Sequence, residues 1–164
     1  GSAGKVNPYL VNSLYAIDRS ITWITELKEK YEKGLLLLDR YTTSSIIYQS
    51  TAFDNLDDKK KFIDFVIDYE YGKLGLPQPD LVLFLYSDFE LAMNLMKNRV
   101  GNAGVSNDIH ESNLEFMRNV YNTAMFVADY LGWDKVKCDD ANSEKLLSID
   151  EIHQKVYTLT KKKI

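Results

Sequence analysis

Cysteine is almost absent from this sequence of 164 residues, and its scarcity excludes two kinds of structure. With Cys138 as the single cysteine, the chain cannot form an internal disulfide or build a metal site from several thiolates. Cys138 lies in a short apolar segment, so we expect it to be a buried structural thiol rather than a nucleophile.

The sequence also has no long hydrophobic run and no excess of positive charge. No apolar segment approaches the roughly 20 residues that span a bilayer, and no signal-peptide pattern opens the chain. The net charge is -4, and the basic cluster at residues 161–163 is only a terminal tail, so the positive surface that nucleic acid requires is missing. We therefore expect a cytoplasmic protein whose partners include neither a membrane nor a nucleic acid.

Apolar segments alternate along the chain with longer amphipathic ones, and this order predicts the fold class. Three short apolar segments are expected to be buried strands: residues 35–38, 81–86 and 135–138. Helices are expected at residues 8–33, from 45 onward, at 59–73, from 87 to 99, through 114–131 and from 148 onward. Strands separated by helices predict an α/β fold of three layers, in which a parallel sheet carries helices on both faces. Since 45% of the residues are hydrophobic and no linker interrupts them, we expect one domain over residues 1–164.

Capping residues mark the ends of several predicted helices. Asn7 can cap the first helix, with Pro8 at its first position, and Ser148 with Glu151 forms the pattern of a capping box before the last helix. Gly132 is expected to close the long helix that precedes it. In the first helix, apolar residues at helical spacing are expected to form a buried stripe: Leu14, Ile17, Ile21, Ile24 and Leu27.

The segment at residues 100–112 contains glycine, asparagine, serine and charged residues without apolar periodicity. Loops of about a dozen residues are uncommon in compact domains and often serve a function. We therefore expect a mobile functional loop in this segment.

Polar residues follow the four leucines at the point where the predicted strand ends. Asp39, Arg40 and Tyr41 stand there, directly before the hydroxyl residues of the next helix. In open parallel sheets, ligands bind beside this end of the strands. Arg40 suits an anionic group there, because a guanidinium holds two phosphate oxygens at once and the amides at a helix start add positive charge. The alternative is a structural ion pair between Arg40 and Asp39 or another acid.

Residues four positions apart share a face of a helix, and two helices carry polar pairs at this spacing. The pairs are Ser44 with Tyr48, Ser45 with Gln49, and Tyr15 with Arg19. The ring of Tyr15 and the guanidinium of Arg19 can stack on a planar base and donate hydrogen bonds to it. The alternative for Tyr15 is a place in the core, where aromatic residues at helical spacing are more common.

Four stretches of the sequence together resemble the bacterial thymidylate kinases. They are LYAIDR at 14–19, DRYTTSSIIYQ at 39–49, LGLPQPDLVLFL at 74–85, and Arg99 followed by DIHE at 108–111. Thymidylate kinases are P-loop kinases with a parallel sheet, and the resemblance implies transfer of the terminal phosphate of ATP to dTMP with Mg²⁺. It also implies a homodimer formed by helices that flank the sheet. The first helix around Trp23 is a candidate contributor, although Trp23 can equally pack within one subunit.

The resemblance assigns roles to individual residues of the dTMP site. Arg40 is expected to hold the dTMP phosphate, and Asp39 to lie near the phosphates and the metal. Tyr15 stands where the family commonly has the phenylalanine that stacks on thymine, and Arg19 where an arginine reaches the base. Ser45 stands where relatives often carry asparagine as a base contact, and Tyr48 lies near the sugar. The expected substrate-binding residues are Tyr15, Arg19, Arg40, Ser44, Ser45, Tyr48 and Gln49.

Arg99 and the segment at 100–112 resemble the lid that closes over the ATP phosphates. The expected lid residues are Arg99, Asp108 and Glu111, and the expected catalytic residues are Asp39, Arg40 and Arg99. The segment departs from the family in having a single arginine between Lys97 and Ser112, and in carrying His110 where some relatives have an aromatic residue. We assign no chemistry to His110, since a lone histidine in a loop is usually only solvated.

The phosphate-binding motif GxxxxGK[ST] does not occur in these residues. The family places this motif, and the strand that leads to it, upstream of the position where this chain begins. We therefore expect a C-terminal part of a longer kinase, poorly stable and inactive alone because two apolar strands would face an empty slot. The alternatives are a related kinase for another base and a nucleotide-binding fragment without catalysis.

Overall fold

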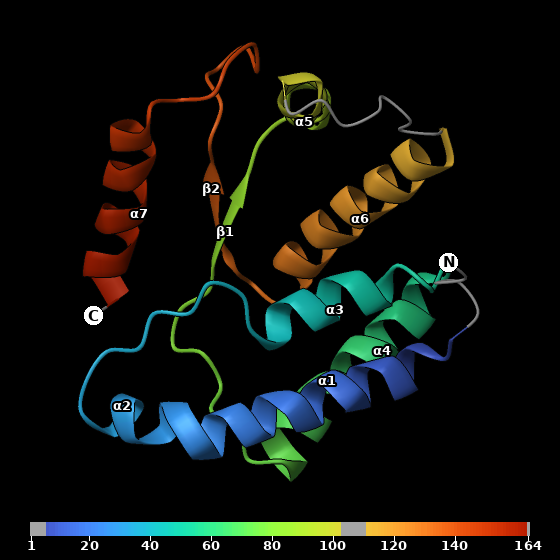
Figure 1. The fold of residues 1–164 in the computed structure, drawn as a ribbon, viewed down its shortest axis with the longest axis vertical. Coiled ribbons are helices and arrows are strands. Elements are labelled where there is room, and N and C mark those ends of the chain that lie inside the picture. The colour runs from blue at the N-terminus through green and yellow to red at the C-terminus, as the bar shows by residue number, and fades with distance from the viewer. Residues whose placement is uncertain (1–5, 103–110, 164) are drawn as a thin grey trace. The chain divides into compact units, whose positions relative to one another are not determined.

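The computed structural model describes residues 6–102 and 111–163, without the side chains of residues 97, 99–102 and 111–113. The chain divides into two compact units, Gly1–Gln78 and Pro79–Ile164 (Figure 1). The expectation that the whole chain forms one domain stays a prediction. No helix in the described ranges is long and apolar enough to cross a membrane.

The first unit is helical. Its long first helix runs as α1 (Pro8–Thr22), the π-helical segment η2 (Trp23–Leu27) and α2 (Lys28–Glu32). The predicted start is confirmed, because the side chain of Asn7 accepts a hydrogen bond from the Tyr9 amide at 2.9 Å and Pro8 follows. The unit continues with α3 (Thr42–Ser50), α4 (Leu56–Ile67) and the π-helical segment η3 (Asp68–Lys73).

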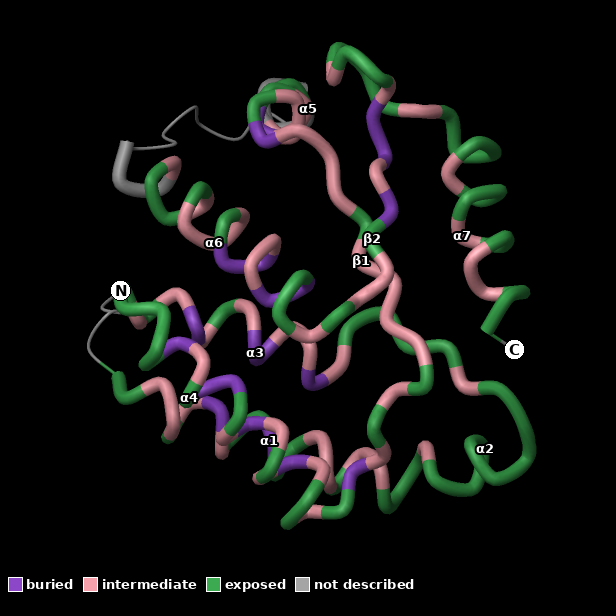
Figure 2. The backbone as a smooth tube through the Cα atoms, turned by 180° about the vertical axis from the view of Figure 1, so that it is seen from behind, coloured by how far each residue is buried: buried purple, intermediate pink, exposed green. Residues whose placement is uncertain are grey.

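Aromatic and aliphatic side chains between α1, α3 and α4 form the core of the first unit. Phe62 and Ile63 of α4, Ile46 of α3 and Ala16 of α1 are almost completely buried. The ring of Tyr9 packs edge-on against Phe62 at 5.1 Å between centroids. Figure 2 shows the buried positions of these helices as short stretches between exposed ones, as amphipathic helices require.

The predicted buried stripe of the first helix is wrong. Leu14, Ile17, Ile21 and Ile24 are exposed by 61, 50, 57 and 71%. The face of α1 that packs into the unit instead carries the buried residues Asn12 and Ala16. The periodicity identified an apolar face correctly, but the helix buries a different side, on which Asn12 donates a hydrogen bond to Glu70.

The predicted strand at residues 35–38 is also absent. These residues have an irregular conformation, and Leu35 and Leu37 are exposed by 79 and 90%. A strand is stable only when neighbouring strands satisfy its backbone groups, and no described strand pairs with this segment. The leucine run is therefore irregular, with Leu35 and Leu37 on the surface of this unit.

The second unit contains two parallel strands and three helices. The strands β1 (Leu83–Tyr86) and β2 (Asp134–Lys137) pair in register from Leu83 opposite Asp134 to Tyr86 opposite Lys137. The helices are α5 (Phe89–Asn102), α6 (Glu111–Tyr130) and α7 (Ile149–Lys163). Within this unit, Figures 1 and 2 show α6 and α7 on opposite sides of the two strands.

Several predictions for the second unit are confirmed. The parallel strands occur near residues 81–86 and 135–138, and Cys138 is buried. Gly132 ends α6 with a φ of 66°, a left-handed conformation that glycine adopts without strain. Ser148 and Glu151 form the capping box, in which each side chain bonds the other residue's backbone amide. The described sheet has two strands, so the wider sheet that we predicted is not seen in it.

The predicted lid lies mostly beyond the described residues. Helix α5 extends to Asn102, three residues past the end that we expected at Arg99. Asp108 and His110 fall within 103–110, which the structure does not describe, and the side chains of Arg99 and Glu111 are outside the description as well.

Candidate functional site

A cavity of about 420 Å³ opens in the first unit. Its walls come from one face of α1 and its continuation, from the segment directly before α3, and from α3 itself. The lining residues are Tyr15, Asp18, Arg19, Thr22, Leu27, Leu38, Arg40, Tyr41, Ser44, Ser45, Tyr48 and Gln49. The volume lies in the range of pockets that hold small ligands.

All seven predicted substrate-binding residues line this one cavity. They are Tyr15, Arg19, Arg40, Ser44, Ser45, Tyr48 and Gln49. Helical spacing explains the convergence, because residues four apart on α1 and on α3 share a face and the two helices pack together. Asp39 is exposed and does not line the cavity, although it directly precedes Arg40.

Arg40 has an unusual backbone conformation just before the amino end of α3. Its φ of 71° lies in the left-handed region, which costs a residue other than glycine on the order of 1–3 kcal/mol. Its exposed side chain forms no ion pair with Asp39 or with any other described acid. The alternative of a structural ion pair is therefore not formed, and the guanidinium is available to a ligand.

The amino end of α3 lies beside Arg40. Tyr41 occupies the capping position, and its side chain does not cap the helix. The first-turn amides therefore contribute their partial positive charge next to the Arg40 guanidinium. Together they form a region suited to an anion.

A buried polar network adjoins the cavity. It is centred on Glu70, which is fully buried in η3. Arg19 donates from Nε to Oε2 of Glu70 at 2.8 Å and from Nη2 to Oε1 at 2.6 Å. Nη2 of Arg19 also donates to Oγ of Ser45 at 3.2 Å. Asn12 Nδ2 and Thr42 Oγ1 donate to the same carboxylate, at 3.2 and 2.7 Å. Sequence reasoning missed Glu70, because its run of residues showed only helical periodicity and no motif marked this acid.

Two stacked phenols flank this network. The rings of Tyr41 and Tyr71 lie 6.4 Å apart between centroids with an interplanar angle of 23°, and Tyr41 donates from its hydroxyl to the Pro77 carbonyl oxygen at 3.1 Å. Burial raises the pKa of Tyr71 to about 12, and burial likewise raises the pKa of Tyr41 above its ordinary value. Both phenols therefore stay protonated and neutral at physiological pH.

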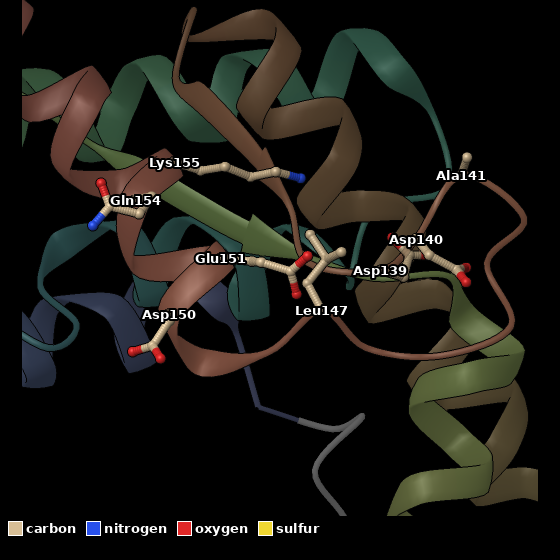
Figure 3. A pocket seen from close by; sticks show the side chains of 8 residues that line it. All are labelled: Asp139, Asp140, Ala141, Leu147, Asp150, Glu151, Gln154 and Lys155. Atoms are coloured by element: carbon tan, nitrogen blue, oxygen red, sulfur yellow. The ribbon is translucent and has the colours of Figure 1, made fainter.

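The second unit has its own cavity, of about 480 Å³, between the end of β2 and the start of α7 (Figure 3). Its lining is rich in acidic side chains and consists of Asp139, Asp140, Ala141, Leu147, Asp150, Glu151, Gln154 and Lys155. Asp139 is buried and accepts a hydrogen bond from the Asp88 amide at 3.0 Å, so it links the ends of the two strands. No cluster of three or more possible metal-binding His, Cys, Asp or Glu residues occurs in the described ranges. None of the predicted site residues lines this cavity.

Comparison with known families matched the chain to thymidylate kinase over residues 2–156. No curated protein and no solved structure matched it.

Proposed function

The chain belongs to the thymidylate kinase family, and from this we propose that the cavity lined by α1 and α3 is its dTMP site. Thymidylate kinases are phosphotransferases that use ATP to phosphorylate dTMP, and they have the fold of P-loop nucleoside monophosphate kinases. The observation that carries the proposal is the convergence of all seven expected dTMP residues on one cavity. We further propose that β1 and β2 belong to a three-layer parallel sheet with helices on both faces.

The phosphate of dTMP binds, in this proposal, to Arg40 and the amino end of α3. The guanidinium is exposed, has no acidic partner among the described residues, and stands beside first-turn amides that no side chain caps. A phosphate takes two parallel N–H donors from such an arginine. The strained backbone of Arg40 supports a ligand-binding role, because such conformations concentrate at functional sites.

The thymine base binds at the α1 side of the cavity. The Tyr15 ring is 53% exposed at the cavity wall, so it is not part of the core and can stack on a base. Arg19 and Ser45 supply polar groups beside it. Tyr48, on α3, lies where the sugar would pass, and Ser44 and Gln49 complete that wall.

The phosphoryl transfer itself needs ATP and Mg²⁺, which neutralises phosphate charge when it is bound. Asp39 suits a role near the metal, since it is an exposed carboxylate next to Arg40 and Mg²⁺ usually takes one or two carboxylates besides phosphates. We propose that Arg99, on α5, and the lid at 100–112 with Asp108 and Glu111 act on the ATP phosphates. The lid stays a prediction because its central residues lie outside the described ranges.

We also propose a homodimer in which α1 meets its copy. The exposed residues Leu10, Leu14, Ile17, Ile21 and Ile24 recur at alternating spacings of four and three, which is the pattern of helices that pack along one another. The ring of Trp23 contacts Tyr31 at 5.5 Å within the same chain. The exposed stripe therefore replaces Trp23 as the main candidate for the interface.

Nucleotide titration with calorimetry tests the proposed function. We expect heat of binding with dTMP and much weaker binding with dGMP, dCMP and AMP. The substitution Arg40→Ala should weaken dTMP binding at least tenfold, because it removes a charge-assisted contact of roughly 1.5–3 kcal/mol. Lys30→Ala, which removes an exposed cation of α2 outside the cavity, is the matched control and should leave binding unchanged. Binding of dTMP within twofold of the parent after Arg40→Ala would contradict the assignment.

A further inference from the structure

Glu70 has the environment of a residue that holds another side chain in place. It is fully buried, and each of its two carboxylate oxygens accepts hydrogen bonds from two different residues. A buried carboxylate is costly unless it is paired and hydrogen-bonded, and Glu70 meets both conditions. Its ion-pair partner is Arg19, which lines the cavity.

The pairing with Arg19 fixes the plane of the guanidinium. Two parallel contacts, at 2.8 and 2.6 Å, join Nε and Nη2 to the two carboxylate oxygens. A planar group held by two parallel bonds cannot turn about its long axis without breaking both. The Oγ of Ser45 accepts a third hydrogen bond from Nη2 and fixes the same edge.

The carboxylate is itself fixed from its other side. Asn12 and Thr42 donate to Glu70, and no hydrogen bond joins either side chain to Arg19 among the described residues. These two residues come from α1 and from the first position of α3. The orientation of Glu70 is therefore set by the backbone elements that also form the cavity.

The remaining edge of the guanidinium has no hydrogen-bond partner within the described residues. The contacts of Arg19 within the described ranges use Nε and Nη2, and Nη1 has no partner there. A guanidinium donates hydrogen bonds and cannot accept them. A free Nη1 group therefore favours a carbonyl oxygen over an amino group as its partner.

We propose that Glu70 is a positioning residue for base recognition, which holds Arg19 so that Nη1 donates to the C4 carbonyl oxygen of thymine. Cytosine carries an amino group at the same place, so its donors would meet the donors of Arg19. A site that leaves buried polar groups unpaired rejects the wrong ligand strongly. The inference rests on the proposed dTMP site and extends it to a residue that does not line the cavity.

The test compares the affinities for dTMP and dCMP by calorimetric titration of the full chain. In the parent we expect dTMP to bind more tightly than dCMP. In Glu70→Gln, one oxygen becomes an NH₂ that repels an Arg19 donor, and the ratio of the two affinities should fall at least about tenfold. A general loss of stability lowers the affinities for dTMP and dCMP equally and leaves their ratio unchanged. The ratio therefore distinguishes a positioning role of Glu70 from a purely structural one.

Two further variants provide a second test and a control. Glu70→Asp retains the buried charge but shortens the side chain, so it should fold and still lose selectivity, because the two-point contact with Arg19 is broken. Ile63→Val is the matched control: it removes one methyl group from the buried core of α4 and leaves the hydrogen-bond partners of Glu70 in place. It should lower the melting temperature and keep the parent ratio. An unchanged ratio in a folded Glu70→Gln or Glu70→Asp protein would overturn the proposal.

A measurement on the parent chain makes the test independent of any variant. In nitrogen-edited NMR spectra without nucleotide, a held Arg19 side chain should give separate Nη signals, and a freely rotating one should give a single averaged signal. An averaged signal would also overturn the proposal. If the parent bound neither nucleotide, the proposed function itself would fail, which is a different result from binding of dTMP with no effect of Glu70.

Discussion

We propose that Tyr48 senses the sugar of the substrate. It lies on α3, lines the cavity and keeps 42% of its surface exposed, so its ring is presented to a ligand and not to the core. In this proposal, the bulky phenol lies beside the sugar and excludes a 2'-hydroxyl group, which dTMP lacks.

The substitution Tyr48→Ala should therefore raise binding of UMP relative to dTMP, by about tenfold if the clash costs about 1.4 kcal/mol. Competition titration of the two nucleotides measures the ratio. Tyr130→Ala, an aromatic truncation of similar exposure in the second unit, is the control. An unchanged ratio in Tyr48→Ala would count against steric exclusion.

Tyr71 links the buried network to the pH dependence of stability. Burial raises its pKa from 10.0 to about 12 in the folded chain. The unfolded chain therefore releases this proton at lower pH than the folded chain, so the free energy of unfolding should fall as pH rises from about 10 to about 12. Tyr41, whose pKa burial also raises, acts in the same direction.

Chemical denaturation at a series of pH values measures this effect. Tyr71→Phe removes the titrating group and should flatten the decline above pH 10, whereas Tyr157→Phe, an exposed tyrosine of α7, should leave it as it is. An equally steep decline in Tyr71→Phe would show that other groups cause it.

At the scale of elements, α4 and the leucine segment contrast in how much they contribute to stability. Phe62 of α4 is fully buried between Tyr9, Phe53 and Phe65. Leu37 is 90% exposed although it belongs to the most apolar run in the chain.

Phe62→Ala should lower the free energy of unfolding by about 3–5 kcal/mol, because it leaves a cavity in the core. Leu37→Ala should change it by less than about 0.5 kcal/mol, as expected for an exposed position. Urea denaturation followed by circular dichroism gives both values. A large loss in Leu37→Ala would mean that the leucine segment is packed in solution.

At the scale of the whole molecule, the exposed apolar stripe of α1 and η2 predicts association of two chains. Light scattering at micromolar concentration should report a dimer. The double substitution Ile17→Lys with Ile24→Lys should give a monomer, because two buried positive charges per helix would face their copies. Ile149→Lys changes an isoleucine of α7 that is 86% exposed and should leave the dimer intact. A monomer of the parent chain in light scattering would contradict the proposed dimer.

Much of this protein follows from its sequence alone. Local signals determined where helices begin and end, as Asn7 with Pro8 and Ser148 with Glu151 illustrate, because caps depend only on neighbouring residues. Helical spacing placed Tyr15 with Arg19 on one face. The four family-like stretches predicted the family that the comparison then matched.

Only the tertiary structure decided which apolar surfaces are buried and which polar groups meet. Periodicity reveals that α1 has an apolar face, but it does not reveal which face the rest of the unit covers, so Leu14 and Ile17 were wrongly placed in the core. The run of four leucines predicted a strand because it is apolar, yet strand formation depends on partners elsewhere in the chain. Glu70 reaches Arg19 across 51 positions of sequence, a pairing that no local pattern encodes. Long-range contacts of this kind exist only once the helices have packed, so the support beneath the cavity could not be predicted from sequence.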